Sequence, residues 1–204
     1  MAVITNFGVP VTGEAGSTLM PKLQYRFRVT FTNLGGASGT KVTRNVMSVG
    51  RPSLTHDDVT IDTYNSKIRL AGKHTWNDIT MTVRDDIDSE VVKLIGAQLN
   101  RQVNHADQES SKSGAGYKFG MKIEMLDGSH DEGDAGVIDS WELVGCFLSD
   151  VQYGELSYAT SEVVQVQTTI RYDNAAHMVG GNDVLSNIGV DLSDDGSATA
   201  GNSG

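Results

Sequence analysis

The sequence predicts a mainly β fold (α+β): a single β-sandwich or barrel-like domain of about seven strands with one flanking helix. Three observations support this prediction. Several segments alternate apolar and polar residues, one segment between them has a helical period, and the chain contains 23 Gly but only 3 Pro. Period-two alternation is typical of a strand with one face on a core. With 204 residues, 38% of them hydrophobic, the chain is long enough for one substantial core.

The first elements follow a polar beginning. Residues 1–22 are small, polar and glycine-containing, and we expect an N-terminal arm without a core of its own. A strand is predicted at Gln24–Asn33, because its aromatic and valine residues alternate with polar ones. A second strand is predicted at Lys41–Val49, before Pro52, which cannot donate to a strand ladder.

A hairpin and a helix come next. Residues 54–75 read as two strands with a tight tip at Asn65-Ser66. Trp76–Arg84 alternates again. From Asp88 to Asn104 apolar residues recur at steps of three and four, which predicts an amphipathic helix capped by Asp88 or Ser89.

Three alternating or apolar segments complete the domain, which we expect to span residues 23–173. Residues 117–125, "YKFGMKIEM", alternate without a fault; 137–154 predict one bent strand or two short ones; 162–172 alternate again. Residues 174–204 are acidic and rich in Gly and Ser, and we expect a C-terminal tail.

Charge and cysteine content exclude several classes of protein. The formal net charge is −10, which repels nucleic acid rather than binding its phosphates. Cys146 is the one cysteine and has apolar neighbours, so a buried thiol is expected. We find no signal peptide and no apolar run near the ~20 residues that cross a bilayer, so we expect a soluble protein made in the cytoplasm.

No chemical site emerges from the motifs. The five histidines have no ligand-like spacing. Residues 127–136 faintly resemble a calcium loop, but Glu132 stands where glycine is required. The acids at 84–90 precede the predicted helix, where the helix dipole favours them. We therefore expect no enzyme activity, no cofactor and no bound metal.

The order of elements resembles the tail tube proteins of contractile-tailed bacteriophages over roughly residues 20–175. The resemblance lies in "NVMSVGRPS", in the hairpin leading into "GKHTWNDITMTVRDDID", and in the helix "SEVVKLIGAQLNRQVNH". It continues in "KFGMKIEMLD" and in the closing "VQYGELSYATSEVVQVQTTIRYDNAA". The chain departs from the shortest members of that family by a loop insertion at 130–136 and by its acidic tail.

The resemblance implies a structural virion protein. Such subunits form stacked hexameric rings, the inner tube of the contractile tail and the conduit for genome ejection into the host, and each gives four strands to an oligomeric β-barrel. The implied partners are further copies of the chain, the tail sheath protein, the tape measure protein, the baseplate hub and the tail terminator. Genomic DNA would pass without specific binding, and no membrane insertion is implied. The implied location is the tail of the virion, with assembly in the host cytoplasm.

Two groups of residues become candidates for assembly. The 54–75 hairpin would correspond to the loop that reaches the adjacent ring, through Asp62, Tyr64, Asn65, Lys67 and Arg69. The polar sides of the later strands would face the lumen or form a polar sheet face, through Lys118, Lys122, Glu124, Gln165, Gln167 and Arg171. Which face lines the lumen stays open. The polar faces carry Arg26, Arg28, Lys118, Lys122 and Arg171, whereas the acids concentrate in loops and the tail. Either neighbours such as Glu124 neutralise these bases or some of them face outward toward the sheath. We expect a lumen without a dominant positive belt.

Geometry is consistent with a channel. Six subunits with four strands each would close a 24-stranded barrel, about 45–50 Å across at ~4.8 Å strand spacing and ~40° tilt. Three alternatives stay open. The first is a tube protein of a type VI secretion system or phage-like particle, and the second is a baseplate protein that initiates the tube. The third is a β-sandwich hydrolase or lyase, which no group of candidate catalytic residues supports.

Overall fold

An antiparallel sheet organises the chain in the computed structural model, which describes residues 21–36, 40–128, 136–159, 161–180 and 182–183. The sheet has eight strands in the order β1-β8-β9-β10-β5-β2, with β11 beside β9 and β12 beside β11. The mainly β prediction is therefore confirmed. The strands are β1 (Phe27–Thr32), β2 (Val46–Val49), β5 (Ile79–Arg84), β8 (Phe119–Leu126), β9 (Val137–Gln152), β10 (Gln165–Arg171), β11 (Asn174–Val179) and β12 (Asn182–Asp183).

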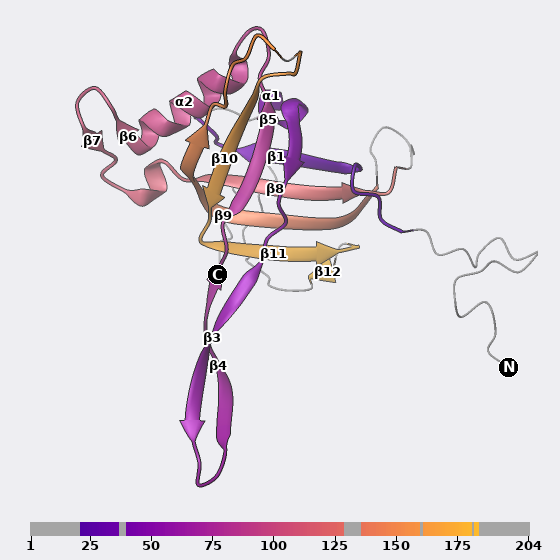
Figure 1. Cartoon of the computed structure of the whole chain (residues 1–204), viewed down its shortest axis with the longest axis vertical. Helices are drawn as coiled ribbons and strands as arrows, with labels where there is room; N and C mark the ends of the chain where they lie inside the picture. Colours follow the sequence, from indigo (N-terminus) through magenta and orange to yellow (C-terminus); the bar gives the residue numbers. More distant parts are fainter. Residues whose placement is uncertain (1–20, 37–39, 129–135, 160, 181, 184–204) are drawn as a thin grey trace, which may run out of the picture.

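The long strand β9 divides the sheet into two layers. Its first part pairs with β8 on one side and β11 on the other, and its last part pairs with β10. Gly145 lies where the partners change and has φ 73°, a conformation that glycine adopts without strain. Figure 1 shows β5 and β10 crossing over β8 and β9. The 137–154 segment is thus one bent strand, one of the two forms predicted.

The alternating segments bury their apolar faces between these layers. In β8, Phe119, Met121 and Ile123 are buried, and Val29 of β1 lies opposite Ile123. From the other layer, the buried residues of β5 and β10 complete one core cluster: Ile79, Met81, Val83, Val166 and Ile170. Each such side chain contributes about 1.5–3 kcal/mol when fully buried. This core explains why period two predicted these strands.

Helix α2 (Glu90–Gln102) covers one end of the core, as predicted, and buries Val91 and Ile95. Its N-cap is Ser89, but the Ser89 side chain makes no capping hydrogen bond. The carboxylate of Asp86 accepts from the Glu90 N–H at 2.9 Å instead. Gln98 is completely buried: its Oε1 accepts from Gly35 N–H at 3.0 Å and its Nε2 donates to the Tyr117 carbonyl at 2.6 Å. The helix is thereby fastened to the end of β1 and the start of β8.

Smaller elements complete the described chain. They are α1 (Thr40–Asn45), the short strands β6 (Val103–Asn104) and β7 (Glu109–Ser110), and a 3₁₀ turn at Gly114–Gly116. Within the described ranges, no helix has both the length and the apolar character needed to cross a membrane.

Two predictions about boundaries are wrong. Lys41–Val49 is not one strand, because Thr40–Asn45 form α1, whose Val42 is fully buried, and the strand is limited to Val46–Val49. The tail does not begin at residue 174, because Asn174–Val179 pair with β9 as β11. Ala175 and Ala176 of β11 are buried, and such small residues give no apolar alternation to detect. The arm expected at 1–20 and the tail at 184–204 lie outside the described residues.

The predicted hairpin is present and extends away from the sheet. It consists of β3 (Leu54–Asp62) and β4 (Lys67–Trp76), which form a separate two-stranded sheet. Figure 1 shows it projecting from one end of the molecule. At its tip the Thr63 N–H donates to the Ser66 carbonyl at 2.8 Å.

Candidate assembly surfaces

The hairpin presents an apolar face to solvent. Val59 pairs with Leu70 and Ile61 pairs with Ile68 across the two strands, so all four side chains share one side. Each of these residues is about half exposed, at 48%, 50%, 47% and 50% respectively. A contiguous apolar surface on a projecting element marks a contact site. The alternation in "VTIDTY" and "KIRL" carried this signal, but sequence analysis named the polar residues of the hairpin instead.

Those predicted loop residues lie on the other face and at the tip. Lys67 Nζ lies 3.5 Å from Asp62 Oδ1, and Arg69 Nη1 lies 3.5 Å from Asp58 Oδ2. These pairs are exposed and therefore contribute little stability. Tyr64 is 98% exposed at the tip, where Asn65 is exposed as well. The hairpin is thus an amphipathic ribbon with a projecting aromatic tip.

The apolar face of this hairpin should become more stable when another surface packs on it. An isolated two-stranded hairpin is at best marginally stable in water. Burying the remaining half of four aliphatic side chains would contribute about 3–6 kcal/mol per subunit, at about 1.5–3 kcal/mol for a whole side chain. This gain is available only when another surface packs on the apolar face.

Aromatic residues hold the root of the hairpin against the body. The ring of His74 lies edge-on between His56 and Trp76, with centroids 6.1 and 6.3 Å away. Trp76 lies 5.7 Å from the ring of Tyr172, and its Nε1 donates to Asn174 Oδ1 at 3.1 Å. Burial raises the pKa of Tyr172 to about 12. The root is therefore fixed to the junction of β10 and β11.

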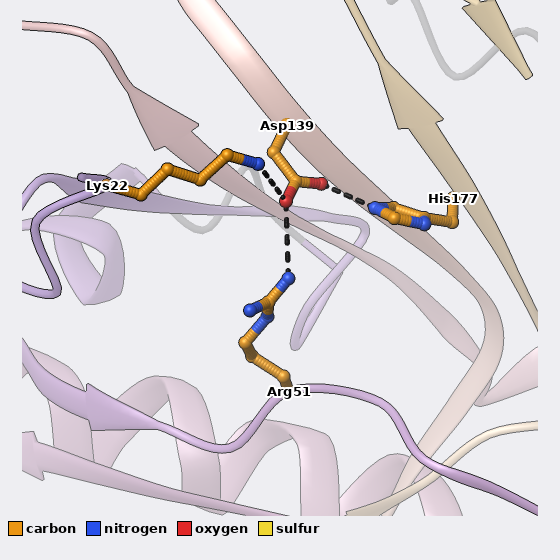
Figure 2. Close-up of polar contacts among 4 residues, drawn as sticks. All are labelled: Lys22, Arg51, Asp139 and His177. Carbon is orange, nitrogen blue, oxygen red and sulfur yellow. Dashed lines mark hydrogen bonds and ion pairs between the residues drawn. The ribbon is translucent and has the colours of Figure 1, made fainter. Parts of the chain in front are cut away.

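Within the main sheet, a buried carboxylate joins four segments of the chain (Figure 2). Asp139 of β9 accepts at Oδ2 from Lys22 at 2.9 Å and from Arg51 at 3.2 Å, and its Oδ1 lies 2.6 Å from His177 Nε2 of β11. Burial raises the pKa of Asp139, but the hydrogen bonds and charges of Lys22 and His177 outweigh it and hold the pKa below its usual value. Sequence analysis missed this cluster, although an Asp within the apolar "VIDSWELV" was a signal of a buried polar partner.

The predicted polar sheet face is divided between two layers. Lys118, Lys122 and Glu124 belong to β8 or its start, whereas Gln165, Gln167 and Arg171 belong to β10 in the crossing layer. The β10 residues are exposed. Glu124 is not on a wet face: it is 5% exposed, with Arg28 Nε at 2.7 Å and Lys122 Nζ at 3.2 Å. The hydrogen bond from Arg28 and the ion pair with Lys122 compensate this carboxylate for the water that it loses on burial.

Three of the basic residues predicted on these faces, Lys118, Lys122 and Arg171, have carboxylate partners. Lys118 pairs with Asp173, Lys122 also lies 3.4 Å from Glu142, and Arg171 donates to Asp78 at 3.0 Å. Sequence analysis asked whether neighbours such as Glu124 neutralise these charges, and for Lys122 and Arg28 Glu124 does so.

Reactive groups are sparse in the part of the chain that the structure describes. Within these residues, no group of three or more His, Cys, Asp or Glu could hold a metal ion. Cys146 is buried, as predicted, and burial raises the pKa of its thiol to about 12. Because little thiolate forms, Cys146 has no route to nucleophilic chemistry in the folded protein.

Sequence comparisons give no match, while solved structures do. No protein-family model matches the sequence, and no curated protein matches it. A chain of the tube-terminating cap of the anti-feeding prophage superposes with a TM-score of 0.61 at 17% identity, covering 84% of this chain and 99% of that one. A chain of the baseplate of the same particle, a 6-fold symmetrised structure, gives a TM-score of 0.61 at 14% identity, covering 79% and 98%.

Two further solved structures come from tubes. A chain of the PVC extracellular contractile injection system, in its extended sheath–tube complex, gives a TM-score of 0.56 at 13% identity and covers 78% and 92%. The SPP1 tail tube gives 0.50 at 10% identity and covers 81% of each chain. The resemblance found in the sequence pattern is thus confirmed at the level of the fold.

Proposed function

From the tail-tube fold of this chain we infer that it is a structural, non-enzymatic subunit of the tube of a contractile tail or injection particle. The observation that carries this proposal is the amphipathic hairpin: four half-exposed aliphatic residues, Val59, Ile61, Ile68 and Leu70, on a projecting ribbon. In the proposed tube the ribbon reaches the adjacent ring and buries this face there. The tip residue Tyr64 and the polar residues Asp62, Asn65, Lys67 and Arg69 accompany it.

Ring formation would satisfy the sheet edges. The sheet order ends in β1 and β2, and within the described residues it does not close on itself. Unpaired strand edges invite association, and closure between copies removes them. A ring of six subunits with four strands each gives a barrel with a backbone diameter of about 45–50 Å, estimated from strand spacing and tilt, and this barrel surrounds a channel.

We place this tube in a contractile phage tail, with sheath, tape measure, baseplate hub and terminator proteins as partners and with genome ejection as its task. The formal charge of −10 supports passage of DNA without binding. The carboxylate partners of Lys118, Lys122 and Arg171 support a lumen without a positive band, whichever face lines it. A particle or type VI secretion tube that carries protein cargo would use the same fold.

A second candidate is a component that starts or ends the tube. The solved structures with the higher TM-scores, 0.61 each, are chains of a baseplate and of a cap, and 98–99% of their lengths are covered. Such a component would form a ring but would not polymerise.

Negative-stain electron microscopy of the purified, concentrated protein tests both candidates. A tube subunit forms long tubes of uniform width, whereas an initiator or cap forms single rings. The double variant Ile61→Asp, Leu70→Asp should stop stacking. Ala106→Asp, Ala115→Asp adds the same two charges at exposed positions between α2 and β8 and should leave stacking intact. Solitary monomers under every condition, with or without a baseplate, would refute the proposal.

A further inference from the structure

A second exposed apolar surface lies at the end of the molecule opposite the hairpin. It is formed by residues 153–159 and 161–164 between β9 and β10, which lie at the top of Figure 1, while the hairpin lies at the bottom. Leu156 is 85% exposed and Tyr158 is fully exposed. Ile87, in the link between β5 and α2, is also fully exposed, and the neighbouring Asp85 N–H donates to the Val164 carbonyl at 3.0 Å.

The residues of this loop line a pocket that is open to solvent. Its volume is about 450 Å³, and its lining includes Gly154, Leu156, Tyr158, Glu162 and Val164. Glu155 and Glu162 give the pocket an acidic character. A hollow lined by both apolar and acidic side chains is a form that accepts a projecting side chain of a partner.

We propose that this pocket receives the tip and the apolar face of the β3–β4 hairpin of the next copy of the chain. The proposal rests on the proposed function and names the surface that the hairpin contacts. Shape agrees, since one end of the molecule projects an aromatic tip, Tyr64, and the other end offers a pocket lined in part by Leu156 and Tyr158.

Charge agrees as well. Lys67 and Arg69 of the hairpin have side chains that are 68% and 76% exposed, and their acidic partners are 3.5 Å away and exposed too. Such weak pairs exchange readily for contacts with Glu155 and Glu162 of the pocket. The hairpin as a whole has as many acids as bases, but its tip, residues 62–69, carries Lys67 and Arg69 against Asp62 alone. This net positive tip favours contact with the acidic pocket over contact between two hairpin tips.

The position of the two surfaces determines the kind of assembly. Contact between different surfaces is heterologous, and it propagates without limit when the next copy continues in the same direction. Surfaces at opposite ends of the long axis meet this condition. Contact between two hairpins would instead close as a dimer and stop.

Complementation between two defective variants tests this pairing. The loop variant Leu156→Asp, Tyr158→Asp keeps its hairpin, and the hairpin variant Ile61→Asp, Leu70→Asp keeps its pocket. All four positions are exposed or half-exposed, and thermal unfolding of each variant checks that it is folded. The matched control is Ala106→Asp, Ala115→Asp, which adds the same two charges at exposed positions outside the hairpin and the pocket.

The expected result is that each double variant alone fails to stack, while a mixture gives assemblies that stop after one junction, seen as paired rings by electron microscopy and as one faster species by sedimentation. The control Ala106→Asp, Ala115→Asp should stack like wild type. A loop variant that stacks normally, or a mixture without paired assemblies, would overturn the docking proposal while leaving the tube function intact. A wild-type chain that never stacks would instead overturn the tube function itself.

Discussion

Ile61 and Ile68 lie directly opposite each other across the β3–β4 hairpin, and each keeps about half of its surface exposed. We predict that amides of residues 54–76 exchange hydrogen rapidly in the free subunit and slowly in the assembly, because a lone ribbon opens easily until its apolar face is covered. Hydrogen exchange followed by mass spectrometry measures this, with β10 as an internal reference that is protected in both states. Equal protection of the hairpin in both states would contradict it.

Asp139 should make the free energy of unfolding depend on pH in the acidic range. Its folded pKa is lowered, so its contribution is complete above its unfolded pKa of about 3.9 and is lost as pH falls through the folded pKa. Asp139→Asn should cost about 1–3 kcal/mol at pH 7, because charge-assisted hydrogen bonds to Lys22, Arg51 and His177 are lost. Urea unfolding from pH 7 to pH 2 checks this. The difference between variant and wild type should shrink below about pH 4, and a difference that stays constant would refute the assignment.

Gly145 should not tolerate a side chain. Its φ of 73° costs a non-glycine residue about 1–2 kcal/mol, and a Cβ there would lie 2.1 Å from Asp173 Oδ2, which holds Lys118. We predict that Gly145→Ala lowers the free energy of unfolding by about 1–3 kcal/mol. The control is Gly96→Ala in α2, where a Cβ meets no atom within 4 Å and the helix should gain about 0.5–1 kcal/mol.

Gln98 should be needed for its hydrogen bonds rather than its volume. Gln98→Leu fills similar space but leaves the Gly35 N–H and the Tyr117 carbonyl without their partner, at about 1–3 kcal/mol for a buried orphan group. Denaturant unfolding should show this loss. Asn100→Leu on the exposed side of α2 should stay within about 0.5 kcal/mol of wild type, and equal effects of the two substitutions would show that Gln98 has no special role.

Cys146 should be inert in the folded protein. The thiol is fully buried and its pKa is raised to about 12, so thiolate is scarce at pH 7 to 8. A maleimide should label wild type only after denaturation, whereas Ser157→Cys on the exposed loop should label at once. Rapid labelling of native Cys146 would mean that the core between β8 and β9 opens.

The sequence predicted those parts of the fold that local periodicity determines. The hairpin, α2 and the strands that carry Met121, Ile123 and Ile170 all follow from spacing that one segment contains by itself. The strand β11 did not, because its buried residues Ala175 and Ala176 are too small to mark an apolar face and its place is decided by pairing with β9. Likewise α1 forms where Val42 packs against elements distant in sequence.

The candidate surfaces were predicted only in part, for the same reason. The hairpin was located by its turn and alternation, but the cluster around Asp139 joins residues 22, 51, 139 and 177, which no local pattern connects. Glu124 was predicted on a wet face, since alternation assigns a side but cannot show that Arg28 on the neighbouring strand covers it. Long-range partners, rather than periodicity, decide these positions.

A cryo-EM reconstruction of the assembly formed by this chain tests the central claim most directly. Our account predicts a hollow stack of rings in which residues 54–76 of every subunit cross from their own ring into contact with the next. A reconstruction in which these residues pack only within their own ring, or a protein that yields no stacked particles at all, would contradict it.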